Sequence, residues 1–273
     1  MLYLVATPIG NLGDISQRAL ETLAAVDFIA AEDTRVTLKL LTHFGIKKPL
    51  VSYYEHNKSG SGAMILERLK NGESAALVTD AGMPAISDPG EDMVAMCAEA
   101  GIDVVIIPGA CAAVSALAMS GLPTGRFTFE GFLSTANKSR REHLDELKTE
   151  RRTMIFYEAP HKLKRTLDDM LEAFGDRRIS LSREMTKIHE ETLRTTLSGA
   201  VAYYAEKPPR GEFVLVIEGC AKAAAQEISQ DDAIVRVREL QAGGATLRDA
   251  VKQVAERTGL AKNVLYNMAL TEE

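Results

Sequence analysis

Apolar runs and amphipathic segments alternate over residues 1–125. Each apolar run is short, and the segment after it has apolar residues every three or four positions, which is typical of a buried strand followed by a helix. Strict alternation of this kind favours a mostly parallel sheet with helices on both faces. The expected strands are Leu2–Ala6, Phe28–Ala31, Leu50–Tyr53, Ala75–Thr79 and Val104–Ile107. The expected helices are Asp14–Val26 with Asp14 as N-cap, Thr34–Gly45, Ala63–Lys70, Glu91–Ala100 and Ala110–Met119.

The pattern changes near Pro123–Arg126, where several strand-like runs follow one another with fewer helices between them. Successive strands without intervening helices indicate a mixed sheet with antiparallel pairs. We therefore expect a first α/β domain over residues 1–123 and a second over 124–221. The strands expected in the second are Thr128–Leu133, Met154–Tyr157, Ile179–Arg183, Glu191–Thr196 and Phe213–Ile217, and the helices are Lys138–Leu147 and His161–Phe174.

The last part of the chain, residues 228–273, has helical periodicity throughout. A small, polar stretch at Lys222–Gln226 is expected to link it to the second domain. The spacing over Leu247–Leu270 is that of a helix-turn-helix with Gly259 in the turn. Such a segment can bind RNA, pack against the rest of the chain or form a dimer contact, and the pattern alone leaves all three open. The expected helices are Asp231–Ala242, Thr246–Thr258 and Asn263–Leu270.

The composition is that of an ordinary globular protein, with 46% hydrophobic and 26% charged residues. The net charge of -6 argues against a protein that coats nucleic acid by bulk charge, because such binding depends on many Lys and Arg contacts to phosphate. The segment Arg126–Arg165 is an exception, since it holds ten Lys or Arg and six Asp or Glu and nets +4. It is a candidate binding face.

The cysteines and the N-terminus indicate a cytoplasmic protein. Cys97, Cys111 and Cys220 form no CxxC pair and no metal-ligand spacing, which fits a reducing compartment and predicts no metal site. The first residues lack the basic region of a signal peptide. No run of about 18 apolar residues is present, so we expect no membrane span.

Three loops follow predicted strands of the first domain, at the carboxyl ends where ligands bind in open α/β sheets. Thr7–Asp14 has neither the GxGxxG spacing nor the Lys-Ser/Thr ending of a phosphate loop, and a plain turn is an equal alternative. Asp80–Gly90 is longer than the usual connection of about two to six residues, and it holds two prolines, two glycines and two aspartates. Pro108–Ala113 places small residues at a helix start, where backbone N–H groups can hold a polar ligand.

The motifs TPIGNLGD, AEDTR, LVTDAGMPAISDPG, PGACAAVSAL, GFL, FYEAPH and RGEFVLVIEG follow one another along the chain, and together they resemble one family. The chain is similar to the ribosomal RNA small subunit methyltransferase I family, within the tetrapyrrole-methylase-like (class III) methyltransferases. The resemblance implies two α/β domains with S-adenosylmethionine in the cleft between them, plus a small C-terminal helical segment. It also implies 2'-O-methylation of a cytidine ribose in small-subunit (16S) ribosomal RNA, or in the 30S subunit, by a homodimer.

The resemblance also implies which residues bind the cofactor. From the first domain, one loop contributes to the cleft, a second surrounds the methionine part and the ribose, and a third offers backbone groups; the second domain closes over the adenine. Pro8 lies in the first of these loops, Asp80, Gly82, Met83, Pro84 and Ile86 lie in the second, and Cys111 and Ala112 lie in the third. The residues of the second domain are Tyr157, Ala159, Gly211 and Glu212. Tetrapyrrole methylases usually carry Gly-Asp-Pro where this chain has Gly82-Met83-Pro84, which favours the RNA branch over a corrin precursor.

The candidates for catalysis follow the strand Ile179–Arg183. Methyl transfer to a ribose hydroxyl needs alignment of the two reacting atoms and a group that receives the proton. Glu184 could accept that proton, or Lys187 could lower the pKa of the hydroxyl. A solvated charged hairpin is the equal alternative for this segment.

RNA contacts are expected from exposed basic and aromatic side chains. The basic candidates are Arg35, Lys39, Lys138, Arg140 and Arg141. Tyr53, Tyr54 and His56 could stack on bases or pack in the core. Two alternatives to the RNA enzyme stay open: a methyltransferase of a small tetrapyrrole, and a non-catalytic module that binds RNA or nucleotides.

Overall fold

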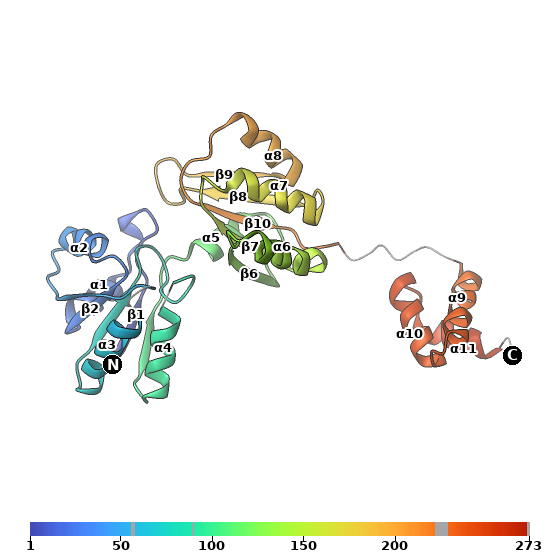
Figure 1. Cartoon of the computed structure of the whole chain (residues 1–273), viewed down its shortest axis with the longest axis horizontal. Helices are drawn as coiled ribbons and strands as arrows, with labels where there is room; N and C mark the ends of the chain where they lie inside the picture. Colours follow the sequence, from blue (N-terminus) through green and yellow to red (C-terminus); the bar gives the residue numbers. More distant parts are fainter. Residues whose placement is uncertain (56–57, 89, 222–228, 272–273) are drawn as a thin grey trace. The chain divides into compact units, whose positions relative to one another are not determined.

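The computed structural model describes residues 1–55, 58–88, 90–221 and 229–271. The chain divides into two units, Met1–Gly219 and Cys220–Glu273 (Figure 1). The first unit contains two five-stranded sheets. We call residues 1–123 the first lobe and residues 124–219 the second lobe. Because the contacts hold the two lobes together as one unit, their division into separate domains stays a prediction.

The sheet of the first lobe is entirely parallel, as its β/α alternation predicted. Its strand order is β3-β2-β4-β1-β5, with β1 pairing with β4 on one side and β5 on the other. Parallel pairing brings all the carboxyl ends to one edge of the sheet. The strands are β1 Leu2–Val5, β2 Phe28–Ala31, β3 Leu50–Ser52, β4 Ala75–Val78 and β5 Val104–Ile107.

Helices cover both faces of this sheet. Alternate residues of β1 point to opposite faces, so Leu4 packs with α3 and α4, while Val5 packs with α1 and α2. Two separate apolar cores result, one on each face. The helices are α1 Gln17–Ala25, α2 Thr34–His43, α3 Lys58–Lys70 and α4 Gly90–Glu99, and a short 3₁₀ helix spans Leu12–Asp14.

The sheet of the second lobe is mixed, as predicted, with order β6-β7-β10-β8-β9. Only the β6–β7 pair is parallel. The strands are β6 Phe127–Phe132, β7 Thr153–Glu158, β8 Arg178–Arg183, β9 Glu191–Thr196 and β10 Phe213–Ile217. The helices of this lobe are α6 Asn137–Glu146, α7 Leu163–Phe174 and α8 Leu197–Glu206, with a 3₁₀ helix at Leu147–Thr149.

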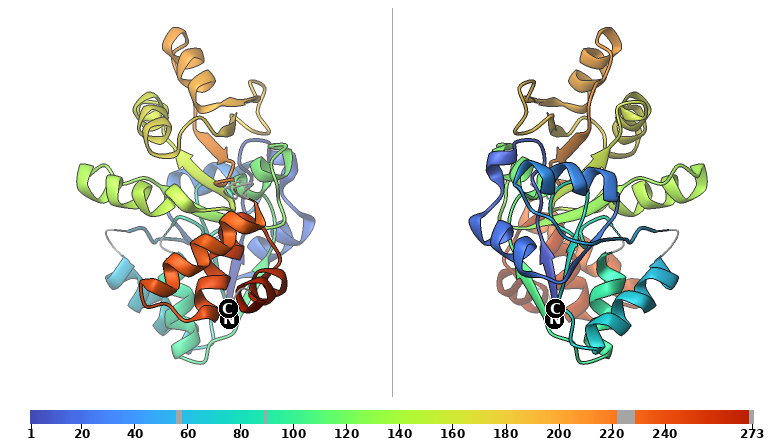
Figure 2. Two further views of the ribbon diagram at one scale, coloured as in Figure 1. Left: turned by 90° about the vertical axis from the view of Figure 1, so that its right-hand side faces the viewer. Right: turned by 90° about the vertical axis from the view of Figure 1, so that its left-hand side faces the viewer.

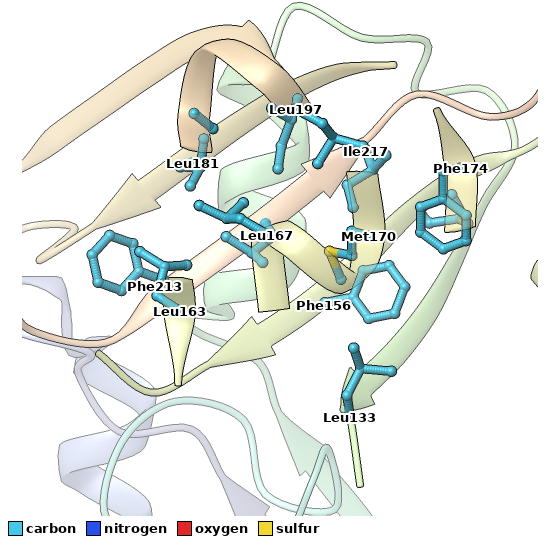
Figure 3. Packing of buried hydrophobic residues seen from close by; sticks show 14 of the residues in the cluster. Leu133, Phe156, Leu163, Leu167, Met170, Phe174, Leu181, Leu197, Phe213 and Ile217 are labelled. Atoms are coloured by element: carbon cyan, nitrogen blue, oxygen red, sulfur yellow. The ribbon is translucent and has the colours of Figure 1, made fainter. Parts of the chain in front are cut away.

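The two faces of the second sheet are covered by different lobes. Helices α6, α7 and α8 cover one face, coloured yellow-green to orange in Figure 2, and enclose the largest apolar core, in which Leu167 and Met170 meet Phe156 (Figure 3). The other face packs against α5, Ala112–Met119, where Ala116 contacts the cluster that includes Val216. Helix α5 thus joins the two lobes.

Most elements match their predicted bounds to within two residues, and three differ more clearly. Helix α1 begins at Gln17 rather than Asp14, because the Ser16 hydroxyl is the N-cap and accepts from the Ala19 N–H at 3.1 Å. Helix α3 begins at Lys58, five residues before the predicted start. Helix α8 was not predicted at all. Its sequence includes Gly199, which lowers intrinsic helix propensity, and the burial of Leu197, Ala200 and Tyr204 supports the helix instead.

The second unit contains three helices among its described residues: α9 Gln230–Ala242, α10 Leu247–Thr258 and α11 Lys262–Thr271. They enclose a core of their own, with Val237, Val254 and Leu265 buried. Gly259 ends α10 in the left-handed conformation, at φ +73°. The predicted helices and turn are confirmed, whereas the predicted linker Lys222–Gln226 lies outside the described residues. No helix in the described parts of the chain is both long and apolar enough to span a membrane.

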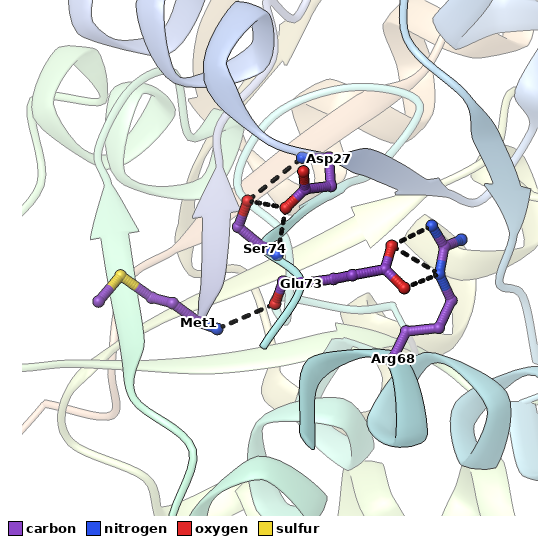
Figure 4. Close-up of polar contacts among 5 residues, drawn as sticks. All are labelled: Met1, Asp27, Arg68, Glu73 and Ser74. Carbon is purple, nitrogen blue, oxygen red and sulfur yellow. Dashed lines mark hydrogen bonds and ion pairs between the residues drawn. The ribbon is translucent and has the colours of Figure 1, made fainter. Parts of the chain in front are cut away.

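Polar contacts fasten the amino ends of the first sheet (Figure 4). The Asp27 carboxylate accepts from the backbone N–H and the hydroxyl of Ser74, both at 2.7 Å. Arg68 pairs with Glu73 at 2.5 Å, and its guanidinium lies 3.6 Å from the centre of the Phe28 ring. The Met1 amino group donates to the Glu73 carbonyl at 3.3 Å. These contacts connect the segments that enter β1, β2 and β4.

Candidate active site

A cavity of about 330 Å³ lies at the carboxyl edge of the first sheet and extends to the second lobe. In the first lobe, every residue that lines it follows a strand: Ala112 begins α5 after β5, and the others lie in the loops after β1, β2 and β4. In the second lobe, the lining comes from the ends of β6, β7, β8 and β10. Its volume is within the range of about 300–1,000 Å³ that is typical of small-molecule sites. Representative lining residues are Ile9, Glu32, Asp80, Ile86, Ala112, Phe132, Tyr157, Arg183, Glu184, Lys187, Glu212 and Val214.

The backbone around the cavity is strained. Among the described residues, four that are not glycine have positive φ: Ala85 (68°), Ser87 (68°), Glu184 (52°) and Thr186 (66°). All four lie in the two loops that line the cavity, Asp80–Gly90 and Glu184–Lys187. Such conformations cost about 1–3 kcal/mol each and cluster at functional sites. The strain therefore makes these two loops the candidates for a functional site.

Side-chain hydrogen bonds hold the strained loops in place. Asp88 Oδ1 accepts from the N–H groups of Ala85 and Gly90, both at 2.9 Å. The Thr186 hydroxyl accepts from the Asn11 N–H at 3.0 Å, which ties the second lobe to the loop after β1. These hydrogen bonds fix the shape of both loops.

Glycines allow these loops to approach one another. Gly82 has φ +90° and is bridged to Thr7 by two backbone hydrogen bonds of 2.9 and 3.0 Å. A Cβ at Gly82 would lie 3.3 Å from Ile9 Cγ2. A Cβ at Gly10 would lie 2.6 Å from Lys187 Cγ, and one at Gly211 would collide with the Glu184 carboxylate. A side chain at Gly10 would therefore separate the two lobes, whereas one at Gly82 or at Gly211 would displace neighbouring loops within a single lobe.

The structure brings some of the predicted cofactor residues to the cavity and not others. Asp80, Ile86, Ala112, Tyr157 and Glu212 line it. Other candidates lie in the adjoining loops without lining it: Gly82, Met83, Pro84, Cys111, Ala159 and Gly211. Pro8 lines a neighbouring cavity of about 370 Å³, formed by the first loop and α2.

Tyr157 connects the two lobes at the cavity wall. Its hydroxyl accepts a hydrogen bond from the Ala113 N–H at 3.2 Å, at the start of α5. Burial, followed by the nearby Cys111, raises the pKa of Tyr157 to about 12. The phenol therefore stays protonated near neutral pH and acts as a hydrogen-bonding group. The Ala159 N–H, in contrast, already donates to Glu158 Oε1 at 2.8 Å.

Carboxylates outnumber cations in the cavity wall. Burial raises the pKa of Glu32, and the neighbouring Asp80 raises it further. Burial likewise raises the pKa of Asp80, whose Oδ1 accepts from the Asp33 N–H at 3.0 Å. The acidic side chains are Glu32, Asp80, Asp88, Glu158, Glu184 and Glu212, against Arg183 and Lys187. A ligand that carries a positive charge suits this wall.

The two candidates for catalysis lie together in the cavity wall. Lys187 Nζ is 3.0 Å from Glu184 Oε1. Both side chains line the cavity, and they form an ion pair. This geometry is compatible with Glu184 as the base and with Lys187 as the cation that lowers the pKa of the hydroxyl.

The prediction that Arg140 contacts RNA is wrong. Its side chain is buried, with the whole residue only 4% exposed. Its Nε donates to Asp169 at 2.5 Å and its Nη2 donates to the Thr166 hydroxyl at 2.8 Å. Arg140 therefore holds α6 against α7 and cannot reach a phosphate.

The other RNA candidates are at the surface. The side chain of Lys138 is 88% exposed and that of Arg35 is 86% exposed, although Arg35 also pairs with Asp33 at 2.6 Å. Arg141 and Lys39 are exposed as well, and Lys39 lines the cavity beside α2. Among the aromatic candidates, Tyr53 is buried in the core and Tyr54 is exposed, while His56 lies outside the described residues.

Sequence reasoning missed several residues of the cavity. Glu32 directly follows β2, so the rule that ligands bind at the carboxyl ends of strands could have found it. Glu158 is the last residue of β7 and is 2% exposed. Its Oε1 is 2.8 Å from the Ala159 N–H, and the Thr166 hydroxyl donates to its Oε2. Glu158 directly follows the predicted strand Met154–Tyr157 and lies in the motif FYEAPH, so the rule for strand ends could have found it as well.

Comparisons with known proteins match this architecture. A family model described as Tetrapyrrole (Corrin/Porphyrin) Methylases matches residues 1–201, and one described as RsmI C-terminal HTH domain matches residues 221–273. A crystal structure of uroporphyrin-III C-methyltransferase from Thermus thermophilus, complexed with S-adenosylhomocysteine, shares the fold. Its TM-score is 0.53 at 17% identity, over 79% of this chain and 96% of that one. The fold is thus that of a methylase of the tetrapyrrole type.

Two curated relatives narrow this class to one family. Both are named Ribosomal RNA small subunit methyltransferase I. The protein from Synechocystis is 50% identical over 100% of this chain and 98% of its own length. The one from Halalkalibacterium halodurans is 50% identical over 98% of this chain and 93% of its own length. The chain belongs to the ribosomal RNA small subunit methyltransferase I family.

Proposed function

We propose that the chain transfers the methyl group of S-adenosylmethionine to the 2'-oxygen of a cytidine ribose in small-subunit (16S) ribosomal RNA. The observation that carries the proposal is the cavity at the carboxyl edge of the first sheet, enclosed by strained loops. Two facts support it: the relatives are named for this RNA, and a structure of the same fold was crystallised with S-adenosylhomocysteine. The acidic wall fits a cofactor with a positive charge.

The residues that line the cavity would hold the cofactor: Asp80, Ile86, Ala112, Tyr157 and Glu212. The other predicted residues, Gly82, Met83, Pro84, Cys111, Ala159 and Gly211, would act through the shape of their loops. S-adenosylmethionine, when bound, supplies a methyl group on a positively charged sulfur. The task of the protein is then to align the ribose oxygen at about 3 Å from that carbon and to remove the hydroxyl proton.

The proposed reaction is a single displacement at the methyl carbon, in which atoms and charges balance. The ribose oxygen forms a bond to the methyl carbon, the sulfur keeps the electron pair of the bond that breaks, and the proton passes to a base. Glu184 is the proposed base, and Lys187 is the proposed cation that lowers the pKa of the hydroxyl. If Glu184 is the base, Glu184→Gln lowers kcat by about 100-fold or more, whereas Lys187→Met leaves most of kcat. The opposite ranking would assign the main role to Lys187.

The decisive experiment follows methyl groups from labelled cofactor into isolated 30S subunits and into naked 16S RNA, with mapping of the modified ribose. The proposal predicts one methylated cytidine ribose in at least one of the two substrates. No ribose methylation in either would refute it. Titration with S-adenosylhomocysteine separates the remaining alternatives, because a module that only binds RNA would not bind this cofactor.

The proposed RNA surface includes Lys138 and Arg141 on α6, with Arg35 and Lys39 on α2. Lys138→Glu combined with Arg141→Glu is expected to weaken RNA binding about tenfold and to lower the slope of its salt dependence by about 1 for each phosphate that is no longer neutralised. Lys47→Glu with Lys70→Glu is the control of equal charge on the first lobe. An unchanged salt slope in the α6 variant would remove this helix from the RNA surface. An enzyme with this substrate would work in the cytoplasm.

The proposed homodimer rests on exposed apolar side chains near the two sheet edges. Strands β5 and β6 are edge strands of their sheets, and helix α5 lies between them in the sequence. The exposed residues are Ile106, Val114, Phe127, Phe129 and Phe132. Val114→Asp is expected to convert a dimer to a monomer in sedimentation equilibrium. A wild-type protein that is monomeric at micromolar concentration would contradict this part of the proposal.

A further inference from the structure

A second cavity, of about 370 Å³, adjoins the proposed cofactor cavity. The loop after β1 and helix α2 form most of its wall, including Pro8, Val36 and Leu40. The two cavities share four lining residues: Ile9, Thr79, Asp80 and Ala81. The first cavity reaches the second lobe, whereas the second is lined by the first lobe alone.

This adjacency has a consequence for the acceptor. In-line methyl transfer requires the acceptor oxygen to approach the methyl carbon to about 3 Å, so the acceptor must occupy space that borders the cofactor. We infer that the second cavity receives the acceptor nucleotide, a pyrimidine nucleoside swung out of the RNA strand, with its ribose at the shared wall. The inference rests on the proposed function, because it takes the first cavity as the cofactor site.

The lining of the second cavity fits a nucleoside attached to a phosphate chain. Leu12, Val36 and Leu40 offer apolar surface to the face of a base. Lys39 is an exposed cation in the wall, where the phosphates on either side of a flipped nucleotide would lie. Arg35, one turn earlier on the same helix, is 86% exposed at its side chain. Helix α2 therefore supplies both base contact, through Val36 and Leu40, and phosphate contact, through Lys39.

Asp80 has a special position in this arrangement. It is the one titratable side chain among the four shared residues, so it faces both ligands. Its backbone follows β4, and its carboxylate is held by the Asp33 N–H at 3.0 Å. The hydroxyl that reacts would therefore lie beside a fixed carboxylate at the boundary of the two cavities.

Filling the second cavity tests the inference. Val36→Trp places a large ring in the cavity wall, while Leu38→Trp makes the same type of change on α2 at an exposed residue that lines neither cavity. In Val36→Trp we expect the affinity for S-adenosylhomocysteine to stay within about twofold of wild type, because its site is the other cavity. We expect kcat/KM for ribosomal RNA to fall by about 100-fold or more, because a displacement of the acceptor oxygen by about 1 Å reduces the rate by a factor of this size. The Leu38→Trp variant should match wild type in both.

A second measurement does not depend on how the tryptophan is tolerated. Wild-type protein labelled at its Val and Leu methyl groups and saturated with S-adenosylhomocysteine is titrated with cytidine monophosphate. The inference predicts shifts at Val36 and Leu40 and none at Leu38. Two results would overturn it: loss of S-adenosylhomocysteine binding in a folded Val36→Trp, or full RNA methylation by that variant without nucleotide shifts at Val36. Failure of the proposed function is distinguishable, since wild type itself would then bind no S-adenosylhomocysteine or would methylate no ribose in ribosomal RNA.

Discussion

Strands β2 and β4 have very different surroundings at their two ends. At their amino ends, Asp27 and Glu73 accept hydrogen bonds from Ser74 and Arg68, which lower the pKa of both carboxyl groups. At their carboxyl ends, burial raises the pKa of Glu32 and of Asp80. The same two strands thus carry stabilised carboxylates at one end and destabilised ones at the other.

The difference separates the contacts that stabilise the fold from the groups that surround the proposed site. At the amino ends, the polar side chains are hydrogen-bonded, and the turn at Gly72 has free space around it. The loop after the carboxyl end of β4 contains Ala85 and Ser87, which have positive φ, and this loop lines the cavity. A site that must bind a cation keeps carboxylates partly buried and close together, although ionisation there costs stability. The apolar cores between the two ends offset that cost.

The largest expected effect compares two glycines at opposite ends of β4. Gly82 and Gly72 have nearly equal backbone angles, φ +90° and +91°, but a Cβ at Gly72 meets nothing within 4 Å. Gly82→Asp should therefore lower the affinity for S-adenosylhomocysteine by about 100-fold or more, because it displaces the loop from Ile9. Gly72→Asp should carry a similar backbone cost, about 1–2 kcal/mol, and leave the affinity unchanged.

Calorimetric titration together with thermal unfolding of both variants measures this contrast. Equal losses of affinity would mean that the effect is one of general stability, and the distinction between the two ends of β4 would break down. Unchanged affinity in Gly82→Asp would remove the Asp80–Gly90 loop from the cofactor site.

A smaller effect is expected from Arg68, which acts only at the amino ends. Arg68→Met removes the ion pair with Glu73 and the cation over the Phe28 ring, with an expected loss of about 1 kcal/mol. The melting temperature should fall by roughly 2–4 °C, with no change in cofactor affinity or kcat. A change in kcat would show that the amino ends are coupled to the site.

The smallest effects concern pH and should have opposite signs at the two ends. Because the pKa of Asp27 is lowered from 3.8, its contribution is present above that pH and is lost as pH falls further. Asp27→Asn should therefore be less stable than wild type at pH 7, with the difference vanishing in acid. Because the pKa of Glu32 is raised from 4.5, its ionisation costs stability as pH rises through the raised pKa. Glu32→Gln should be the more stable protein at pH 7.

Thermal unfolding of wild type and both variants from pH 3 to pH 8 tests the opposite signs. The difference between Glu32→Gln and wild type should shrink as pH falls towards 4.5. If both variants lose stability at pH 7, the carboxylates at the two ends are alike and the comparison fails.

The first lobe was more predictable than the second, for a topological reason. In a parallel sheet, chain direction alone places the loops after β1, β4 and β5 at one edge. In the second lobe, β10 runs against its neighbours, so its first residue, Phe213, pairs with Glu158 of β7 and Arg183 of β8 at their carboxyl ends. The rule for strand ends does not lead to Gly211 or Glu212, and only the resemblance to a family indicated them.

Two further errors show the limits of local patterns. Arg140 has the same sequence surroundings as its exposed neighbour Arg141, and its burial depends on Thr166 and Asp169, which lie 26 and 29 residues away. Helix α8 depends on tertiary packing rather than on propensity. The second cavity could not be predicted either, because its wall combines α2 with loops that become neighbours only in the folded chain.

The central claim is that the cavity lined by both lobes holds the methyl donor. The most direct test is a crystal structure of the chain with S-adenosylhomocysteine. We predict the ligand between the Asp80–Gly90 loop and Tyr157, with Glu212 in its wall and the cavity beside Val36 left free. A ligand seated beside Val36 and Leu40, or bound outside the first unit, would contradict the claim.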